Sequence, residues 1–534
     1  MPMFQGRMRE ARAHSEAPRG RSLPRGRSGR IALVLLGLLV GAWAVYRPEV
    51  QRPFDFIDFP ESILILKRHD SVLAQFSAFT SSYWREARFN PMMYLSVVLK
   101  WKMFGWWTPG WQLMRFATMS TIVLLAYALL RRLGISALGA LGGATVFIIA
   151  PPAVRGWIRL SSAEPLATLL VLVATLMATR IQETRHRLGA VLSIAVLGAL
   201  VVLTKEMLAV AFLLPIFVVL TVRPSGRLGA PRLSDGRLTT VGLAVLVLGA
   251  SITPSIWAFV SAPKASYGKL FGSAAPSVLD GLGVALAALL PFVPTTGDVG
   301  VLLVGVAYAG LLLAGLPLAL TASDERSHTT TLLSLAAILP LACGLAYLPW
   351  PHFQMVYALP FLFGEAAMVA VAISQLERLG RIAGVGACVA WCLVLTYAIP
   401  DALSSARRIQ ATQVVTGDLI ARLANRQGVD SVLVVGPETV FDPRARFAPR
   451  LTMAASSQGL RIPTTVDVSC AVGAIAAGVR PNVLVVWSTL ACGVPPMPGE
   501  SIRRDFPRFD WRAFRWREAS MRLDILAARS VKEE

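Results

Sequence analysis

The stretch IALVLLGLLVGAWAVY, residues 31–46, sets the fold class, because sixteen apolar residues in a row are typical of a membrane-inserted helix. Residues 1–30 before it hold eight arginines against Glu10 and Glu16 and are rich in Gly, Pro and Ser, a composition that predicts disorder. Arg47-Pro48-Glu49 follows the stretch where a signal peptide would have small residues. We therefore expect an uncleaved first span with a basic cytoplasmic tail at residues 1–30.

The composition of the whole chain agrees with a membrane protein. Of 534 residues, 55% are hydrophobic, and the mean hydropathy is +0.59. The net charge of +21 comes from basic residues that lie beside the apolar runs, as the positive-inside rule requires. No RNA-binding or base-stacking motif accompanies this charge, so nucleic acid is not expected as a partner.

The apolar runs predict a mainly α, polytopic protein of the inner (plasma) membrane with about eleven transmembrane helices. The transmembrane domain, residues 31–399, is expected to span at 31–46, 112–130, 135–153, 164–179, 188–203, 207–221, 240–260, 299–320, 330–348, 355–374 and 382–399. Basic short loops place the N-terminus in the cytoplasm and the C-terminus outside; the loop 323–330 fits this rule poorly. The external loops are then 47–111, 154–163 and 261–298. For the pair 188–203 and 207–221, the alternative is a broken helix pair at membrane depth.

The tail, residues 400–534, is long enough for a small extracytoplasmic domain. Ser431–Val435 and Asn482–Trp487 are rich in Val and Leu and predict buried strands, so a small α/β domain is expected. Cys470 and Cys492 would lie in an oxidising compartment, where a disulfide is favoured. The alternative is two unrelated buried thiols.

Acidic residues stand out on the predicted outer face, where charge near a membrane needs solvent, a partner or a ligand. Asp55, Asp58 and Glu61 belong to the sequence DFIDFPES, residues 55–62, in the first external loop. Taken alone, this loop favours a solvated acidic turn before an amphipathic helix, with Asp58 and Glu61 as cap residues. Glu164 opens an apolar helix on the same predicted face.

Basic and aromatic residues accompany these acids. Arg155 and Arg159 lie on the outside against the positive-inside bias; they either bind phosphate, pair with Glu164 or extend to the interface. Lys205 and Glu206 separate two apolar segments and form either a local ion pair or a phosphate site. The last group consists of Trp350-Pro351-His352, Gln354 and Tyr357, which alone indicates little more than an aromatic belt.

Taken in order, these motifs resemble a known family. DFIDFPES is followed by Arg88-Phe89-Asn90-Pro91, by Phe104-Gly105, and by Arg115 leading into a span that ends in RRLG. Glu164, LTKE at 203–206 and HFQMVYALPF at 352–361 come next. This order resembles the polyprenyl-phosphate-dependent glycosyltransferases of the GT-C fold, and most of all the bacterial branch related to protein O-mannosyltransferases and the lipid A aminoarabinose transferase.

The resemblance implies a transfer of sugar from a polyprenyl-phosphate donor, with inversion, to an extracytoplasmic carbohydrate, lipid or protein acceptor. It implies that Asp58, or else Asp55, acts as general base, with Glu164 as a second acid. The family's acidic pair is adjacent, whereas here it is spread over seven residues. A divalent metal cofactor is used by some relatives and stays undecided. The implied substrate-binding residues are Glu61, Arg88, Arg155, Arg159, Lys205, Glu206, His352 and Tyr357.

The alternative is a non-catalytic membrane scaffold, or a transporter or flippase for a lipid-linked saccharide. Such transporters often contain internal repeats and charges deep in their spans. This chain shows no convincing repeat, and its charges gather at the outer ends of spans. This distribution favours an enzyme that works at the interface, and for such an enzyme we expect the acids and the basic groups to meet on one face.

Overall fold

The computed structural model describes residues 25–46, 65–84, 89–105, 107–160, 162–181, 187–222, 228, 235–261, 299–321, 326–347, 355–424, 431–435, 464–468, 483–488, 500–510 and 515–527. It comprises two compact units, Met1–Ala44 and Val45–Glu534. Several predicted site residues lie outside the described residues: Asp55, Asp58, Glu61, Arg88, His352, Cys470 and Cys492.

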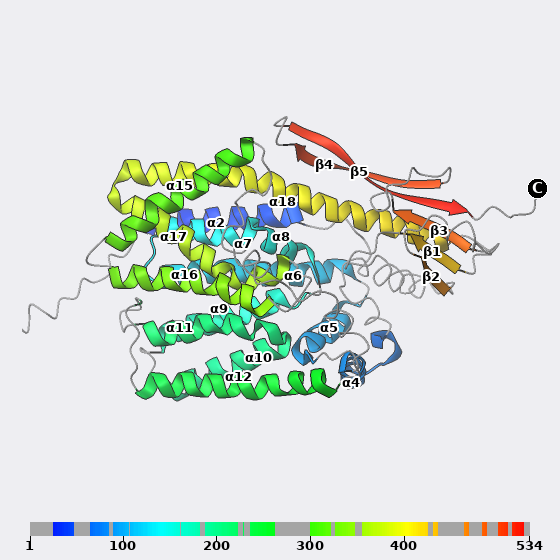
Figure 1. The fold of residues 1–534 in the computed structure, drawn as a ribbon, viewed down its shortest axis with the longest axis horizontal. Coiled ribbons are helices and arrows are strands. Elements are labelled where there is room, and N and C mark those ends of the chain that lie inside the picture. The colour runs from blue at the N-terminus through cyan, green and yellow to red at the C-terminus, as the bar shows by residue number, and fades with distance from the viewer. Residues whose placement is uncertain are drawn as a thin grey trace, which may run out of the picture. The chain divides into compact units, whose positions relative to one another are not determined.

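Apolar helices make up most of the described chain (Figure 1). Four described segments are long and apolar enough to cross a membrane: Thr108–Arg132 in α6, Arg237–Trp257, Tyr357–Leu379 and Arg381–Ser404. Shorter apolar helices cover Ile31–Tyr46, Leu188–Thr204, Glu206–Thr221, Gly305–Leu318 and His328–Gly344. The chain is thus a multi-pass membrane protein, and the total of eleven spans stays a prediction.

Helices make up most of the described residues of the larger unit. In chain order they are α4 (Val72–Trp84), α5 (Pro91–Phe104), α6 (Thr108–Arg132), α7 (Ala137–Ile149), α8 (Pro151–Ile158), α9 (Glu164–Arg180), α10 (Arg187–Thr204), η2 (Glu206–Phe212), α11 (Leu213–Thr221), α12 (Asp235–Ser261), α15 (Val299–Thr321), α16 (Arg326–Tyr347), η3 (Met355–Phe361), α17 (Leu362–Leu379) and α18 (Arg381–Ala424). The helix α2 (Arg25–Tyr46) belongs mainly to the smaller unit.

One predicted span is bent, and two others are joined by a short irregular segment. The segment expected at 135–153 is bent by 59° between α7 and α8, because Pro151 and Pro152 cannot donate the hydrogen bonds that would continue α7. The segments 188–203 and 207–221 correspond to α10 and to η2 with α11, and whether they form two spans or one broken helix at membrane depth stays a prediction. Lys205 between them has extended backbone, with φ −165° and ψ 117°, and a 3₁₀ turn follows.

The centre of the bundle is α17, which contacts α7, α15 and α16 and is almost entirely buried. Small residues permit this close packing, since a helix without side-chain bulk lets backbones approach. A Cβ added at Gly143 of α7 would lie 2.5 Å from the carbonyl oxygen of Ala366 in α17. Pairing of this kind fixes α17 against α7.

The C-terminal part of the chain forms a sheet. The strands are β1 (Ser431–Val435), β2 (Thr464–Val468), β3 (Val483–Ser488), β4 (Glu500–Asp510) and β5 (Arg515–Ala527), in the order β2-β1-β3-β5-β4. The first three pair in parallel, and β5 joins β3 and β4 antiparallel. The two strands predicted from sequence are confirmed, whereas an α/β domain stays a prediction.

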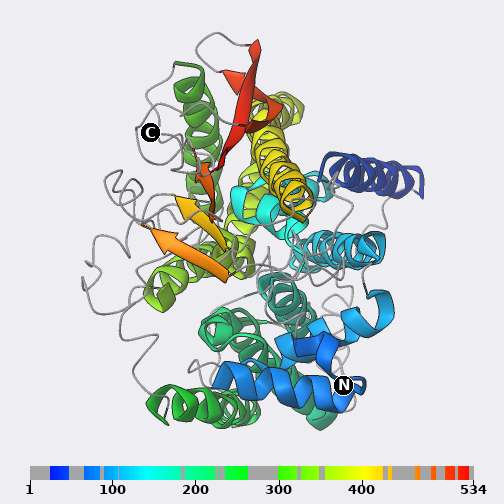
Figure 2. The same ribbon diagram turned by 90° about the vertical axis from the view of Figure 1, so that its right-hand side faces the viewer.

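The helix α18 links the bundle to this sheet. It is a 44-residue helix that continues through Pro400, so the residue at which the tail was expected to begin lies within a helix. Its second half packs against β4 and β5, which run beside it in both views (Figures 1 and 2).

Candidate active site

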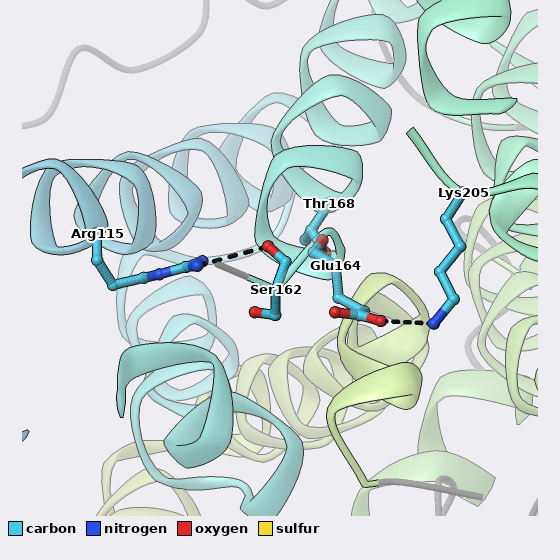
Figure 3. A network of polar contacts seen from close by, with 5 residues as sticks. All are labelled: Arg115, Ser162, Glu164, Thr168 and Lys205. Atoms are coloured by element: carbon cyan, nitrogen blue, oxygen red, sulfur yellow. Dashed lines mark hydrogen bonds and ion pairs between the residues drawn. The ribbon is translucent and has the colours of Figure 1, made fainter. Parts of the chain in front are cut away.

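Glu164 is the first residue of α9 and is 3% exposed. A carboxylate at this position faces the positive end of the helix dipole, which stabilises it. Its Oε1 accepts a hydrogen bond from Nζ of Lys205 at 2.7 Å, an ion pair between residues 41 positions apart (Figure 3). The predicted meeting of an acid with a basic group is therefore observed for Glu164 and Lys205.

Lys205 is held by the break between α10 and η2. Its Nζ lies 3.5 Å from the centroid of the Tyr357 ring, an arrangement that stabilises a cation. Burial lowers the pKa of the Lys205 ammonium, but Glu164, Tyr357 and Glu206 outweigh it and raise the pKa above its ordinary value. Lys205 is thus a charged ammonium enclosed by two carboxylates and an aromatic ring.

Glu206 connects this cluster to the start of α5. With the Asn90 side chain oriented so that its nitrogen faces acceptors, the amide donates to Glu206 Oε2 at 2.5 Å and to the carbonyl of Phe89 at 3.0 Å. The hydroxyl of Ser255 in α12 also donates to the Phe89 carbonyl, at 3.2 Å. Asn90 is buried, and the start of α5, η2 and α12 meet around it.

Two further basic side chains contact the segment just ahead of Glu164. A guanidinium nitrogen of Arg115 in α6 donates to the carbonyl of Ser162 at 3.4 Å, as Figure 3 shows, and Nζ of Lys100 donates to the carbonyl of Leu160 at 3.4 Å. Burial and the neighbouring Arg115 lower the pKa of Lys100 to about 7. These bonds pin the short segment that leads into α9.

The two arginines predicted as site residues, Arg155 and Arg159, are more exposed than Glu164. Arg155 is exposed and Arg159, just after the helix, is half-buried. The helix itself packs on η3, which carries Tyr357, and a Cβ added at Gly156 would lie 3.0 Å from Leu359 of η3. Both arginines therefore belong to the same end of the bundle as the Glu164–Lys205 pair.

Asn90, Lys100 and Arg115 were not predicted as site residues, although Asn90 and Arg115 fall within the quoted motifs. Arg115 carried a usable signal in the sequence, since a charge within an apolar segment long enough to cross a membrane needs a specific partner. Lys100 and Asn90 have no comparable sequence signal, because their positions depend on how α5 packs.

Comparison with known proteins gives structural neighbours alone. No family model matches the chain, and no curated protein matches its sequence. The chain is similar to ArnT from Cupriavidus metallidurans bound to undecaprenyl phosphate, with a TM-score of 0.47, 12% identity, and coverage of 93% of this chain and 98% of that one.

Two other solved structures are similar. One is the arabinofuranosyltransferase AftD from Mycobacteria, in its R1389S mutant, with TM-score 0.46, 16% identity, and coverage of 94% of this chain and 42% of that one. The other is the oligosaccharyltransferase of Archaeoglobus fulgidus in complex with zinc and sulfate, with TM-score 0.41 and 12% identity. The match covers 85% of this chain and 68% of that one. The chain thus spans less than half the length of AftD.

All three neighbours are GT-C proteins, the group that the sequence motifs resemble.

Proposed function

We propose that this protein is an integral membrane glycosyltransferase that moves a sugar from a polyprenyl-phosphate donor to an extracytoplasmic acceptor with inversion. The observation that carries the proposal is the Glu164–Lys205 pair under the Tyr357 ring, since it unites three of the sequence motifs at the ends of apolar helices. An ion pair of this kind is costly to place near a membrane unless it serves a site.

In this proposal the base comes from the first external loop. Asp58 removes the proton from the acceptor hydroxyl, and Asp55 is the second candidate. Glu164 orients the acceptor from the opposite segment, because Lys205 fixes the direction of its carboxylate. The acceptor oxygen then attacks the anomeric carbon from the face opposite the lipid phosphate, which leaves with the bonding electron pair.

Cations are needed where that phosphate departs. Lys205 has three N–H donors, and one of them is occupied by Glu164. We propose that Lys205 binds the phosphate together with Arg155 and Arg159. The arginines are needed because Glu164 already neutralises the Lys205 ammonium and Glu206 lies close to it. Tyr357 keeps the Lys205 side chain in place for this contact.

The metal requirement is a separate question. Among the residues that the structure describes, no three His, Cys, Asp or Glu side chains gather as a metal site. The acids of residues 55–61 lie outside that set, so the use of a divalent metal stays undecided. Chelation tests it: loss of transfer that added divalent metal restores would show that a metal is required.

The test is incubation of the purified protein in proteoliposomes with a panel of polyprenyl-phosphate sugars and candidate acceptors. Transfer of sugar, or release of free polyprenyl phosphate, is the expected result with at least one donor. Movement of the intact lipid-linked sugar between leaflets, with no release of lipid phosphate from any donor, would assign the protein to the flippase class instead.

A further inference from the structure

The bend between α7 and α8 leaves two backbone carbonyls without the donors that a continuous helix would supply. In an α-helix, the carbonyl of each residue accepts from the amide four positions later. The residues four positions after Phe147 and Ile148 are Pro151 and Pro152, which have no amide hydrogen. An unsatisfied carbonyl is costly inside an apolar bundle, so these two carbonyls need donors from elsewhere.

Two aromatic side chains supply those donors. The indole Nε1 of Trp157 in α8 donates to the carbonyl of Phe147 at 3.0 Å. The hydroxyl of Tyr46, the last residue of α2 and part of the larger unit, donates to the carbonyl of Ile148 at 2.9 Å. Tyr46 and Trp157 are buried, and their rings stack with centroids 5.9 Å apart. The ring of Phe116 in α6 packs against Trp157 as well, so the bend is enclosed by aromatic rings.

Trp157 also fixes which side of α8 faces α7. Successive residues of a helix are turned by about 100°, so Arg155, two positions earlier, lies on nearly the opposite side of α8 from Trp157. In agreement, Trp157 is buried and Arg155 is exposed. Arg159 follows Arg155 by four positions, where side chains share a face, and its amide donates to the Arg155 carbonyl at 3.0 Å. The indole bond therefore keeps both arginines on the side of α8 turned away from α7.

Other contacts fix the segment that leaves α8. Nζ of Lys100 donates to the carbonyl of Leu160, and Arg115 donates to the carbonyl of Ser162, each at 3.4 Å. The helix α9 begins six residues after α8 ends, so α8 is held on one side by the aromatic rings and on the other by these bonds. The orientation of α8 thus decides where its arginines lie relative to the start of α9.

We propose that Tyr46 and Trp157 are positioning residues for the donor: by fixing the bend and the rotation of α8, they hold Arg155 and Arg159 where the lipid-linked phosphate binds. This inference rests on the proposed function, since it takes that phosphate as the ligand of the two arginines. Because the phosphate is already an anion in the bound donor, displacement of the arginines should weaken donor binding more than it slows the transfer step.

The experiment compares the full chain in proteoliposomes with two variants. Tyr46→Phe removes one hydroxyl and keeps the ring; Trp157→Phe removes the indole N–H, and Tyr46→Phe carries the test where Trp157→Phe does not fold. Trp391→Phe is the matched control, because its buried indole also bonds to α7, at 3.1 Å from the Thr145 hydroxyl and ahead of the bend. Donor KM and kcat are measured with the polyprenyl-phosphate sugar of the panel that gives transfer. Hydrogen exchange of the α8 amides is measured by mass spectrometry without substrate.

Expected in Tyr46→Phe and Trp157→Phe is a donor KM raised about 2- to 10-fold, the range that loss of one hydrogen bond gives, with a smaller change in kcat. The α8 amides should exchange faster in both variants, and Trp391→Phe should keep the donor KM and the α8 exchange of the unaltered protein. An unchanged donor KM or unchanged α8 exchange in Tyr46→Phe overturns this proposal alone, as does an equal rise of donor KM in Trp391→Phe. Absence of transfer by the unaltered protein overturns the proposed function, and this proposal with it.

Discussion

Removal of the Lys205 charge is the perturbation whose size the structure fixes best. The side chain of Glu164 is 4% exposed and that of Lys205 is 17% exposed, so Lys205→Met leaves a buried carboxylate without its cation. Breaking a buried pair in this way costs about 3–5 kcal/mol of unfolding free energy. The loss of the contact with the Tyr357 ring adds on the order of 1 kcal/mol.

Removal of the Glu164 charge should lower the free energy of unfolding by less than removal of the Lys205 charge. Glu164→Gln leaves Lys205 beside the second carboxylate, Glu206, and beneath the Tyr357 ring, so the remaining charge is partly compensated. The double variant Glu164→Gln/Lys205→Met removes both charges and should recover most of the stability lost in Lys205→Met, because no buried charge is left unpaired.

The assay is reversible unfolding of the purified protein in mixed micelles, with the four proteins of this double-mutant cycle compared under one condition. Lys205→Arg, which keeps the charge, is the control and should retain most of the stability. Equal stability of Lys205→Met and the unaltered protein, or additive losses in the double variant, would refute the buried ion pair.

Three further outcomes are expected. Burial lowers the pKa of Lys100 from an ordinary 10.5 to about 7, so between these pH values Lys100 binds fewer protons in the folded chain than in the unfolded one. The free energy of unfolding should therefore rise as the pH increases through this window. Unfolding measured at a series of pH values should show this rise, and Lys100→Met should flatten it. Gly143→Ala should cost about 1–3 kcal/mol through overpacking, whereas Gly189→Ala, with open space at its Cβ, should be neutral or slightly stabilising in the same unfolding measurement. Cys470 and Cys492 should resist alkylation in the unreduced, denatured protein; free thiols there would exclude the predicted disulfide, whose expected contribution is about 2–4 kcal/mol.

The apolar runs and the helix start at Glu164 could be predicted from sequence, because long hydrophobic stretches and an acid at a helix N-terminus are local signals. The strand at Ser431–Val435 was found for the same reason. The bend at Pro151 is not predicted from hydropathy, because residues 135–153 form a continuous apolar stretch. The pair Pro151-Pro152 is the sequence signal that indicates the bend.

The composition of the site was harder to predict. Lys205 could be singled out as a charge between apolar segments, but its partner 41 residues away depends on how α9 and α10 pack together. Asn90 and Lys100 enter the cluster through the position of α5, which is set by tertiary contacts with α10 and α12. Contacts between segments so far apart in the chain cannot be predicted from the local sequence.

The central claim is that the Glu164 carboxylate, held by Lys205, serves glycosyl transfer. The most direct measurement compares release of free polyprenyl phosphate from a lipid-linked sugar by the unaltered protein, by Glu164→Gln and by Asp58→Asn, each reconstituted at equal folded amount. The account predicts release by the unaltered protein, a loss on the order of 10²- to 10⁴-fold for Asp58→Asn, and a clear loss for Glu164→Gln. Full release by both variants, or none by the unaltered protein with any donor, would contradict it.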